Sequence, residues 1–354
     1  MLAIASETPA ILRYGEATPG LIRRILTSTH SSGWPQTAKN LTVNEQMAIR
    51  KNSRDYEDVR TRETQEDSGS PLYGLFSYKN TLNLGDEIQS IAASTFLPRI
   101  DYFINRDTIS LYDRQNIKLI MNGWYGHAPE FWPPPDAISP LLVSMHISEE
   151  ITKQNKTKTL PSSIILSERN QEYLRQHGPI GARDLNTMRM FNDSGVDSYF
   201  SGCITLTLPF YLGERTDEVC CVDINDQLFI YLKSLSKYKL SQYSHVEYDN
   251  SRLKRFALAT DLLDRYKRAR LVVTSRLHCA LPCLAFGTPV VFVESAPDHY
   301  RFDGLRELLH VAPLSNLESV AQLAHVAELY GNKTDFSPLR RELQATASRF
   351  VHGK

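Results

Sequence analysis

The sequence carries no excess charge of either sign, because forty lysines and arginines balance forty aspartates and glutamates. Proteins that bind nucleic acid over a broad surface usually carry a net basic field. The sequence also lacks any apolar run near the roughly 18 to 20 residues that cross a bilayer, and its start lacks the basic-then-apolar order of a signal peptide. These absences argue against nucleic acid as a partner and against a transmembrane segment, and they favour a cytoplasmic location.

Cysteine is scarce and unpatterned. The five cysteines are an odd number, two of them are adjacent, and none lies in a paired CxxC pattern with metal spacing. We therefore expect reduced, mostly buried thiols and no metal site, which favours a reducing compartment.

Several common catalytic motifs are missing as well. The sequence has no GxSxG, no GxxxxGK[ST], no GxGxxG after a predicted strand and no HExxH. Serine hydrolases, P-loop NTPases, dinucleotide-dependent oxidoreductases and zinc proteases are disfavoured accordingly. No cofactor is expected.

The length, 354 residues, exceeds what a single hydrophobic core usually supports, so two domains are expected. The stretch from Thr37 to Ser70 is polar and rich in charge, and we expect residues 1–70 to be a partly flexible lead-in. The fold should then begin near Pro71, with one domain over 71–200 and a second over 201–354. A homo-oligomer is compatible with the sequence, which does not fix the oligomeric state.

Strand-like apolar runs alternate with helical patterns from Pro71 onward, which predicts βαβ units and mostly parallel sheets. The two series suggest an α/β fold of two Rossmann-like halves that face each other across a cleft, with ligands at the carboxyl ends of strands. In the first series we expect strands at 72–78, 116–124, 141–147 and 162–167 and a helix at 85–97. In the second we expect strands at 219–224, 244–249, 269–275 and 288–295, and helices at 226–238, 255–269 and 276–286, the last interrupted by Pro282.

A polar loop follows the first predicted strand. Gly85 lets the backbone approach a ligand there, and the helix that begins near Asp86 offers free N–H groups. Asn83 and Asp86 could hydrogen-bond sugar hydroxyls at such a crevice. A tight turn with Asp86 as the N-cap explains the same residues, so both interpretations stay open.

Aromatic side chains concentrate in residues 120–136, where Trp124 follows a predicted strand. Aromatic faces beside polar groups suit carbohydrate, although a loop packed by its own aromatics has the same composition. His146 lies near the end of the next predicted strand and can reach the cleft. We place Trp124 and His146 on the acceptor side of a site.

The segment HGPIGARDLNTMRMF places Arg183 just before a predicted helix. The planar guanidinium matches phosphate or carboxylate, and a helix start adds partial positive charge. A surface arrangement in which Arg183 and Asp184 cap the helix is the structural alternative.

The strongest candidate is residues 272–295, where a buried strand delivers Ser275, Arg276 and His278 to the start of a helix. Hydroxyl, guanidinium, imidazole and free N–H groups can converge there on one anion. A purely structural role would require carboxylates close by, because burying Arg and His without partners costs several kcal/mol. Glu294 ends the following strand and could meet those cations or a sugar hydroxyl.

Four segments, taken in order and spacing, resemble the polysaccharide pyruvyl transferases: NLGDEIQSIAA, PIGARD, SGCITLTL and TSRLHCALPCLAFGTPVV. The resemblance runs from about Tyr73 to beyond Val293. It implies a fold similar to the glycosyltransferase B architecture, phosphoenolpyruvate as the donor substrate, and a glycan or sugar acceptor. The sequence departs from many glycan-modifying enzymes at Ser201–Cys203, where SGC replaces an acidic GD pair, so donor or acceptor preference could differ.

The resemblance also assigns residues. Arg183, Arg276 and His278 match the family's donor-binding and catalytic positions. The expected donor-binding set is Ser275, Arg276, Leu277, His278 and Arg183, and the expected acceptor-binding set is Asn83, Gly85, Asp86, Trp124, His146 and Glu294.

A mechanism consistent with these groups has the two arginines hold the donor and His278 act as general acid, while His146, Asp86 or Glu294 serves as base. Two rivals remain open: a nucleotide-sugar-dependent glycosyltransferase of the same architecture, and a non-catalytic carbohydrate-binding relative.

Overall fold

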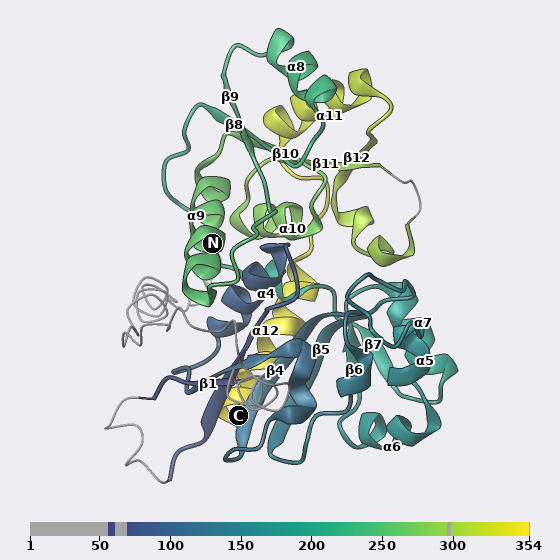
Figure 1. The fold of residues 1–354 in the computed structure, drawn as a ribbon. Helices are drawn as coiled ribbons and strands as arrows, with labels where there is room; N and C mark the ends of the chain where they lie inside the picture. Colours follow the sequence, from purple (N-terminus) through teal and green to yellow (C-terminus); the bar gives the residue numbers. More distant parts are fainter. Residues whose placement is uncertain (1–55, 61–68, 296–298, 354) are drawn as a thin grey trace, which may run out of the picture.

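Two β-sheets organise the chain (Figure 1). The structure is a computed structural model, and it describes residues 56–60, 69–295 and 299–353. Within them, the first sheet has seven strands in the order β1-β3-β2-β4-β5-β6-β7, and the second has five in the order β12-β11-β10-β8-β9. Neighbouring strands run parallel throughout except β1, which pairs antiparallel with β3. The fold is therefore mixed α/β with parallel sheets, as the alternating pattern predicts.

The strands of the first sheet are β1 Tyr56–Asp58, β2 Leu72–Ser77, β3 Tyr102–Asn105, β4 Ile117–Tyr125, β5 Ile138–Ile147, β6 Ile180–Ala182 and β7 Ser198–Phe200. Those of the second are β8 Glu218–Val222, β9 Lys239–Tyr243, β10 Leu271–Thr274, β11 Val290–Glu294 and β12 His310–Pro313. The helices are α4 Gly85–Ser94, α5 Pro161–Ile165, α6 Glu168–Gln176, α7 Leu185–Asp193, α8 Asp226–Leu235, α9 Arg252–Arg268, α10 Leu277–Phe286, α11 Leu317–Tyr330 and α12 Ser337–His352. Short 3₁₀ turns that matter below are η3 Ile204–Thr207 and η4 Tyr300–Phe302.

Strands β8, β10 and β11 of the second sheet are almost entirely buried, which explains why they are nearly continuous apolar runs. Side chains alternate along each strand: Val272 joins the core between the two sheets, whereas Val273 joins a separate core beneath α8 and α11. All five cysteines are buried and form no disulfide, as expected.

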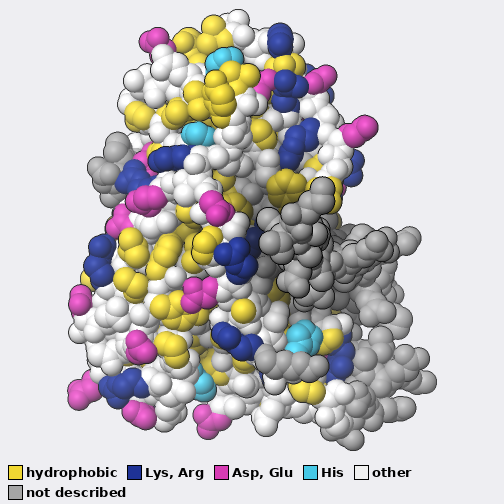
Figure 2. Space-filling model, turned by 180° about the vertical axis from the view of Figure 1, so that it is seen from behind, with side chains coloured by type: hydrophobic (Ala, Val, Ile, Leu, Met, Phe, Trp, Pro, Cys, Tyr) yellow, Lys and Arg dark blue, Asp and Glu magenta, His cyan; other side chains and the backbone are white. Residues whose placement is uncertain are grey.

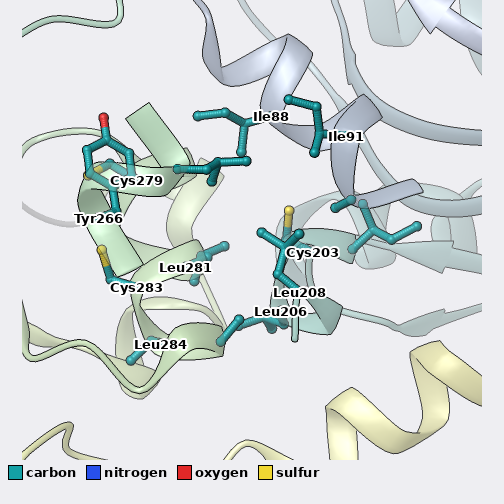
Figure 3. Close-up of a cluster of buried hydrophobic side chains, with 14 of the residues drawn as sticks. Ile88, Ile91, Cys203, Leu206, Leu208, Tyr266, Cys279, Leu281, Cys283 and Leu284 are labelled. Carbon is teal, nitrogen blue, oxygen red and sulfur yellow. The ribbon is translucent and has the colours of Figure 1, made fainter. Parts of the chain in front are cut away.

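A continuous apolar core joins the two sheets (Figure 3). Ile88 and Ile91 come from α4, Cys203, Leu206 and Leu208 lie in and around η3, and Cys279, Leu281, Cys283 and Leu284 come from α10. These side chains belong to one cluster with residues of both sheets. The two halves of the molecule are thus packed against each other along this side.

The last helix, α12, crosses back to the first sheet although it lies within 201–354 (Figure 1). Leu343, Ala347 and Val351 share the core with Tyr73 of β2. Lys118 of β4 donates a hydrogen bond to the carbonyl of Phe350 at 2.8 Å. The domain boundaries expected from the sequence stay a prediction, and this helix connects the two spans.

Two predicted strands are wrong. Residues 162–167 begin instead as helix α5, whose first residue, Pro161, has the φ that a first helical turn needs. Residues 244–249 are irregular, and the strand of that unit is β9, which begins five residues earlier. Short apolar runs do not distinguish strand from helix by periodicity alone, which accounts for the first error.

Three boundary predictions also need correction. The fold does not begin at Pro71, because β1 lies within the expected lead-in. Asp86 is not an N-cap: α4 already begins at Gly85, and Leu84 precedes it without a side-chain cap. Helix α10 runs through Pro282 without interruption, although a proline there leaves one helical hydrogen bond unmade. Residues 1–55 and 61–68 lie outside the described part of the chain.

Candidate functional site

Four basic side chains from different elements gather where the two sheets meet. His146 comes from β5, Arg183 follows β6, His278 lies in the first turn of α10, and Arg301 lies in η4. We call these four residues the arginine–histidine cluster. Arg183, His146 and His278 are buried, and the charges of Arg183 and Arg301 both lower the pKa of His278, which indicates that the four lie close together.

Local backbone features aim the histidines. One extra residue in β5 opposite β4 makes a β-bulge at Ser144, whose φ is 53° and whose N–H donates to Ser201 Oγ at 3.1 Å. A bulge re-aims the side chains that follow it, here His146. On α10, His278 packs against Gly85: a Cβ at Gly85 would lie 3.0 Å from His278 Nδ1, so only glycine fits without displacement.

His146 and Asp184 form a buried pair. His146 Nδ1 lies 2.6 Å from Asp184 Oδ2, and the opposite ring nitrogen, Nε2, has no hydrogen-bond partner among the described residues. Burial, reinforced by the charge of Arg183, lowers the pKa of His146 to about 4. Burial opposes the ionisation of Asp184, but the His146 interaction and the Arg183 charge hold its pKa below the ordinary value. A neutral His146 that donates from Nδ1 leaves Nε2 as a free acceptor.

Arg183 is fully buried, yet no described residue accepts a hydrogen bond from any of its three nitrogens. Its one ionic contact is Asp184 Oδ2, 3.7 Å from Nε. Asp184 already accepts from His146 and from the Thr187 amide, which it caps at 2.9 Å. Buried guanidinium groups normally have their donors satisfied, and a planar fork with open donors has the chemistry to hold a phosphate or carboxylate.

His278 also has an unsatisfied ring nitrogen, because its Nε2 has no hydrogen-bond partner among the described residues. Burial, followed by the charge of Arg183, lowers the pKa of His278 well below the ordinary value. A bound anion would add opposite charge beside this ring and raise its pKa again.

Ser275 and Arg276 are held by the turn after β8. Ser275 Oγ donates to the Asp223 carbonyl at 2.6 Å, and Arg276 Nε donates to Asp223 Oδ2 at 2.7 Å. Asp223 has φ 50°, a strained value that is common at functional turns. Leu277, the first residue of α10, is buried. The Arg276 side chain is 36% exposed and remains accessible beside the cluster.

A cavity of about 260 Å³ opens beside Arg276. It lies between the loop before α4 and the region after β9, and residues of both halves line it: Thr81, Leu82, Asn83, His127, Gln154, Val246 and Arg276. Asn83 thus lies at a cavity as expected. Trp124 does not line it directly, but its ring contacts His127 edge-on at 4.6 Å.

Two expected acceptor residues are engaged elsewhere. Asp86 is buried and pairs with Arg106, whose Nη1 lies 3.3 Å from Asp86 Oδ1. Glu294 pairs with Arg306. The structure does not bring either carboxylate to the arginine–histidine cluster by any contact of the described residues.

The sequence reading did not identify Arg301, the neighbouring Tyr300, or Asp184 as the partner of His146. The signal for Arg301 was weak, since it follows the last recognisable strand motif. No group of three or more His, Cys, Asp or Glu side chains among the described residues could hold a metal ion. None of the described helices combines the length and apolar character that crossing a bilayer requires.

A search of curated proteins found no match. Among solved structures, the chain is similar to a functionally uncharacterized protein from Klebsiella pneumoniae subsp. pneumoniae, with 12% sequence identity and a TM-score of 0.36 over 65% of this chain and 87% of that one. The family model for polysaccharide pyruvyl transferase matches residues 83–297, which is more than half of the chain and includes Arg183, His146 and His278. This chain belongs to the polysaccharide pyruvyl transferase family.

Proposed function

We propose that this protein transfers a pyruvyl group from phosphoenolpyruvate to two hydroxyls of a glycan or sugar acceptor and forms a cyclic ketal. The observation that carries the proposal is Arg183, a fully buried guanidinium with three unpartnered nitrogens among the described residues. We further propose that 71–200 and 201–354 form two Rossmann-like domains of a glycosyltransferase B-like architecture, with the donor between them.

The donor carries a phosphate and a carboxylate, and both need cationic or N–H partners. Arg183 offers a planar fork, and the start of α10 adds the positive end of a helix. The amides of Ser275 and Arg276 are already engaged there, because they donate to the Val222 carbonyl at 3.3 Å and to Thr274 Oγ1 at 2.9 Å. Low solvent access strengthens these charge-assisted contacts.

His278 is the proposed general acid. Transfer of its proton to the methylene carbon of the donor makes that carbon a methyl group and leaves the central carbon electrophilic. One acceptor hydroxyl adds there as it loses its proton. The second hydroxyl then attacks the same carbon and loses its proton as the carbon–oxygen bond to phosphate breaks. The two hydroxyl protons balance the one gained by carbon and the one carried off by phosphate.

The base is proposed to be His146. Asp86 and Glu294, the other two candidates, are paired with Arg106 and Arg306. His146 instead presents an unpartnered Nε2 while Asp184 fixes the opposite nitrogen. A carboxylate orients this histidine, and its low pKa keeps Nε2 unprotonated and able to accept a proton at neutral pH.

The acceptor is proposed to occupy the 260 Å³ cavity beside Arg276. Its lining combines apolar surface from Leu82 and Val246 with polar groups from Asn83, His127 and Arg276. That mixture suits one sugar unit, whose C–H faces and hydroxyls need different neighbours. Trp124 supports this wall through His127.

The test measures phosphate release from phosphoenolpyruvate across a panel of galactosides, mannosamine-containing glycans and glucuronosides. His278→Ala and Arg276→Ala should each lower the rate by about 10² to 10⁴-fold with an unchanged circular dichroism spectrum. The exposed residues His325 and Arg341 supply matched controls, and His325→Ala and Arg341→Ala should retain the full rate. Full activity in both site variants would refute the proposal. So would thermal stabilisation of the wild type by a nucleoside diphosphate but not by phosphoenolpyruvate, which would favour a glycosyltransferase.

A further inference from the structure

Residues 299–304, which we call the crossing segment, lie between strands β11 and β12 of the second sheet but dock on the first half of the chain. The Leu185 amide at the start of α7 donates to the Asp303 carbonyl at 3.1 Å, and Arg189 of α7 pairs with the Asp303 carboxylate at 3.1 Å. Gly304, at φ 84°, packs so closely on Phe200 that a Cβ would lie 2.8 Å from its ring. The crossing segment is therefore held in a defined position against the wall that carries Arg183.

Tyr300 and His299 fix the orientation of the crossing segment further. The Tyr300 ring stacks on His146, with centroids 6.2 Å apart and an interplanar angle of 19°. His299 Nε2 lies 3.1 Å from Glu150 Oε1, just after β5. Both contacts place the residue that follows them, Arg301, beside the other three members of the arginine–histidine cluster.

Arg301, like Arg183, has a guanidinium nitrogen without a hydrogen-bond acceptor among the described residues. Its Nε is buried without a hydrogen-bond partner among the described residues. Burial lowers the pKa of Arg301, and the nearby charge of Arg183 lowers it further. Two guanidinium groups therefore lie close enough to repel each other.

The acidic groups that the structure describes near this pair, Asp184 and Glu150, are already engaged. Asp184 accepts from His146 and from the Thr187 amide, and Glu150 contacts His299. Holding two like charges close together without acceptors is costly unless a ligand supplies the opposite charge. One dianionic group, such as a phosphate monoester, offers enough oxygens and charge to satisfy both guanidinium groups at once.

We propose that Arg301 is a second donor-binding residue, and that Arg183 and Arg301 grip the same dianionic phosphate from opposite halves of the molecule. The identity of that phosphate as part of phosphoenolpyruvate rests on the proposed function, whereas the paired-arginine site does not. The crossing segment is the device that brings the second arginine to the first.

The experiment measures binding of inorganic phosphate and of phosphoenolpyruvate by calorimetry, with thermal melting of each variant. Arg301→Gln should weaken both ligands by tenfold or more, and Arg301→Lys, which keeps the charge but loses the fork, should weaken them less. The melting temperature of unliganded Arg301→Gln should equal or exceed that of the wild type, because a repulsive pair has been removed. A merely structural arginine would lower it.

Arg189→Gln is the matched control. Arg189 contacts the same crossing segment, but its side chain is 58% exposed and faces Asp303, so ligand binding should stay at the wild-type level. Wild-type affinity in Arg301→Gln would overturn the proposal, as would an equal loss in Arg189→Gln. Should Arg301→Gln fail to fold, wild-type affinity in Arg301→Lys would count against a bidentate grip.

The two hypotheses fail separately. If the wild type binds inorganic phosphate through both arginines but releases no phosphate from phosphoenolpyruvate with any acceptor, the paired-arginine site stands and the proposed function falls. If the wild type turns over and Arg301→Gln binds both ligands normally, the reverse holds.

Discussion

Two fully buried arginines in this protein have opposite surroundings. Arg255 of α9 meets Glu87 of α4 through two hydrogen bonds, from Nε at 2.6 Å and from Nη2 at 2.9 Å. The carbonyls of Glu247 and Asn83 accept further bonds at 3.2 and 3.3 Å. Arg183 has the same burial and no hydrogen-bond acceptor among the described residues.

The different surroundings of Arg255 and Arg183 distinguish two regions of the interface between the two halves of the molecule. Where α4 packs on α9 and α10, apolar side chains and the Glu87–Arg255 pair leave the cation fully partnered, and the interface is closed (Figure 3). Where β5, β6 and the start of α10 meet, the cations lack partners. Burial alone therefore does not distinguish Arg183 from Arg255, whereas the acceptors around each of them do. On the face that Figure 2 presents, basic and acidic side chains are interspersed.

Replacing each buried arginine by methionine gives the largest contrast. Arg255→Met leaves Glu87 buried without its partner and should lower the free energy of unfolding by about 3 to 5 kcal/mol. Arg183→Met should leave stability unchanged or raise it, while phosphate release is lost. Urea denaturation and the phosphate-release assay measure the two outcomes.

The double variant Glu87→Met/Arg255→Met is the control for that contrast. Because an apolar pair of similar volume replaces both charges, most of the lost stability should return. If Arg183→Met proved as destabilising as Arg255→Met, the two arginines would not differ in the way their contacts indicate.

Substitutions in the apolar region of this interface should change the free energy of unfolding but not donor binding. Leu281→Ala, in the middle of α10, removes a fully buried side chain and should cost about 3 kcal/mol. Thermal or urea unfolding measures the loss, and phosphoenolpyruvate should still bind the folded fraction. Leu212→Ala is the matched control, since Leu212 is 91% exposed and its loss should change stability by less than about 0.5 kcal/mol. If the packing of this core also determined the shape of the donor site, Leu281→Ala would lose affinity for phosphoenolpyruvate.

Lowering the pH should reduce the free energy of unfolding through the buried histidines before most carboxylates are protonated. Burial lowers the pKa of His146 and of His245 to about 4, and that of His278 falls well below its ordinary value. Between about pH 6.5 and pH 4 the unfolded chain binds protons that these folded histidines do not, so the free energy of unfolding falls as pH falls. Each such histidine contributes roughly 2 kcal/mol of loss by pH 5.

His245→Gln isolates one of these contributions with a residue that is not itself a member of the arginine–histidine cluster. His245 lies beside Tyr266, with Nε2 2.9 Å from the phenol oxygen. Its replacement should flatten the slope of stability against pH in that range by about one proton. An unchanged slope would mean that this histidine is protonated in the folded protein.

Local sequence patterns predict the α/β class, the helices at α4, α7, α8, α9 and α10, and the strand that delivers His278, because continuous apolar runs and helical spacing are local signals. They do not predict β6, the three-residue strand that delivers Arg183. It could not predict the Asp86–Arg106 and Glu294–Arg306 pairs, because each joins residues whose proximity depends on the tertiary fold. The strand predicted at 162–167 is wrong because a short apolar run does not distinguish strand from helix, and Pro161 favours the start of a helix there.

Within the candidate site, motifs identified the residues on strand ends and helix starts but missed Arg301. That residue reaches Arg183 only because the crossing segment docks on α7, through contacts of Asp303 and Gly304 that no local pattern encodes. Likewise, the pairing of His146 with Asp184 requires β5 and β6 to lie side by side.

The return of α12 to the first sheet has a consequence for biosynthesis. Tyr73 and Lys118 belong to strands made early, yet their partners at Phe350 and Val351 are made only after the whole second sheet. Part of the apolar face of that sheet stays uncovered while the second sheet is being translated. A nascent chain of this protein consequently offers a hydrophobic surface to chaperones until translation of α12 is complete.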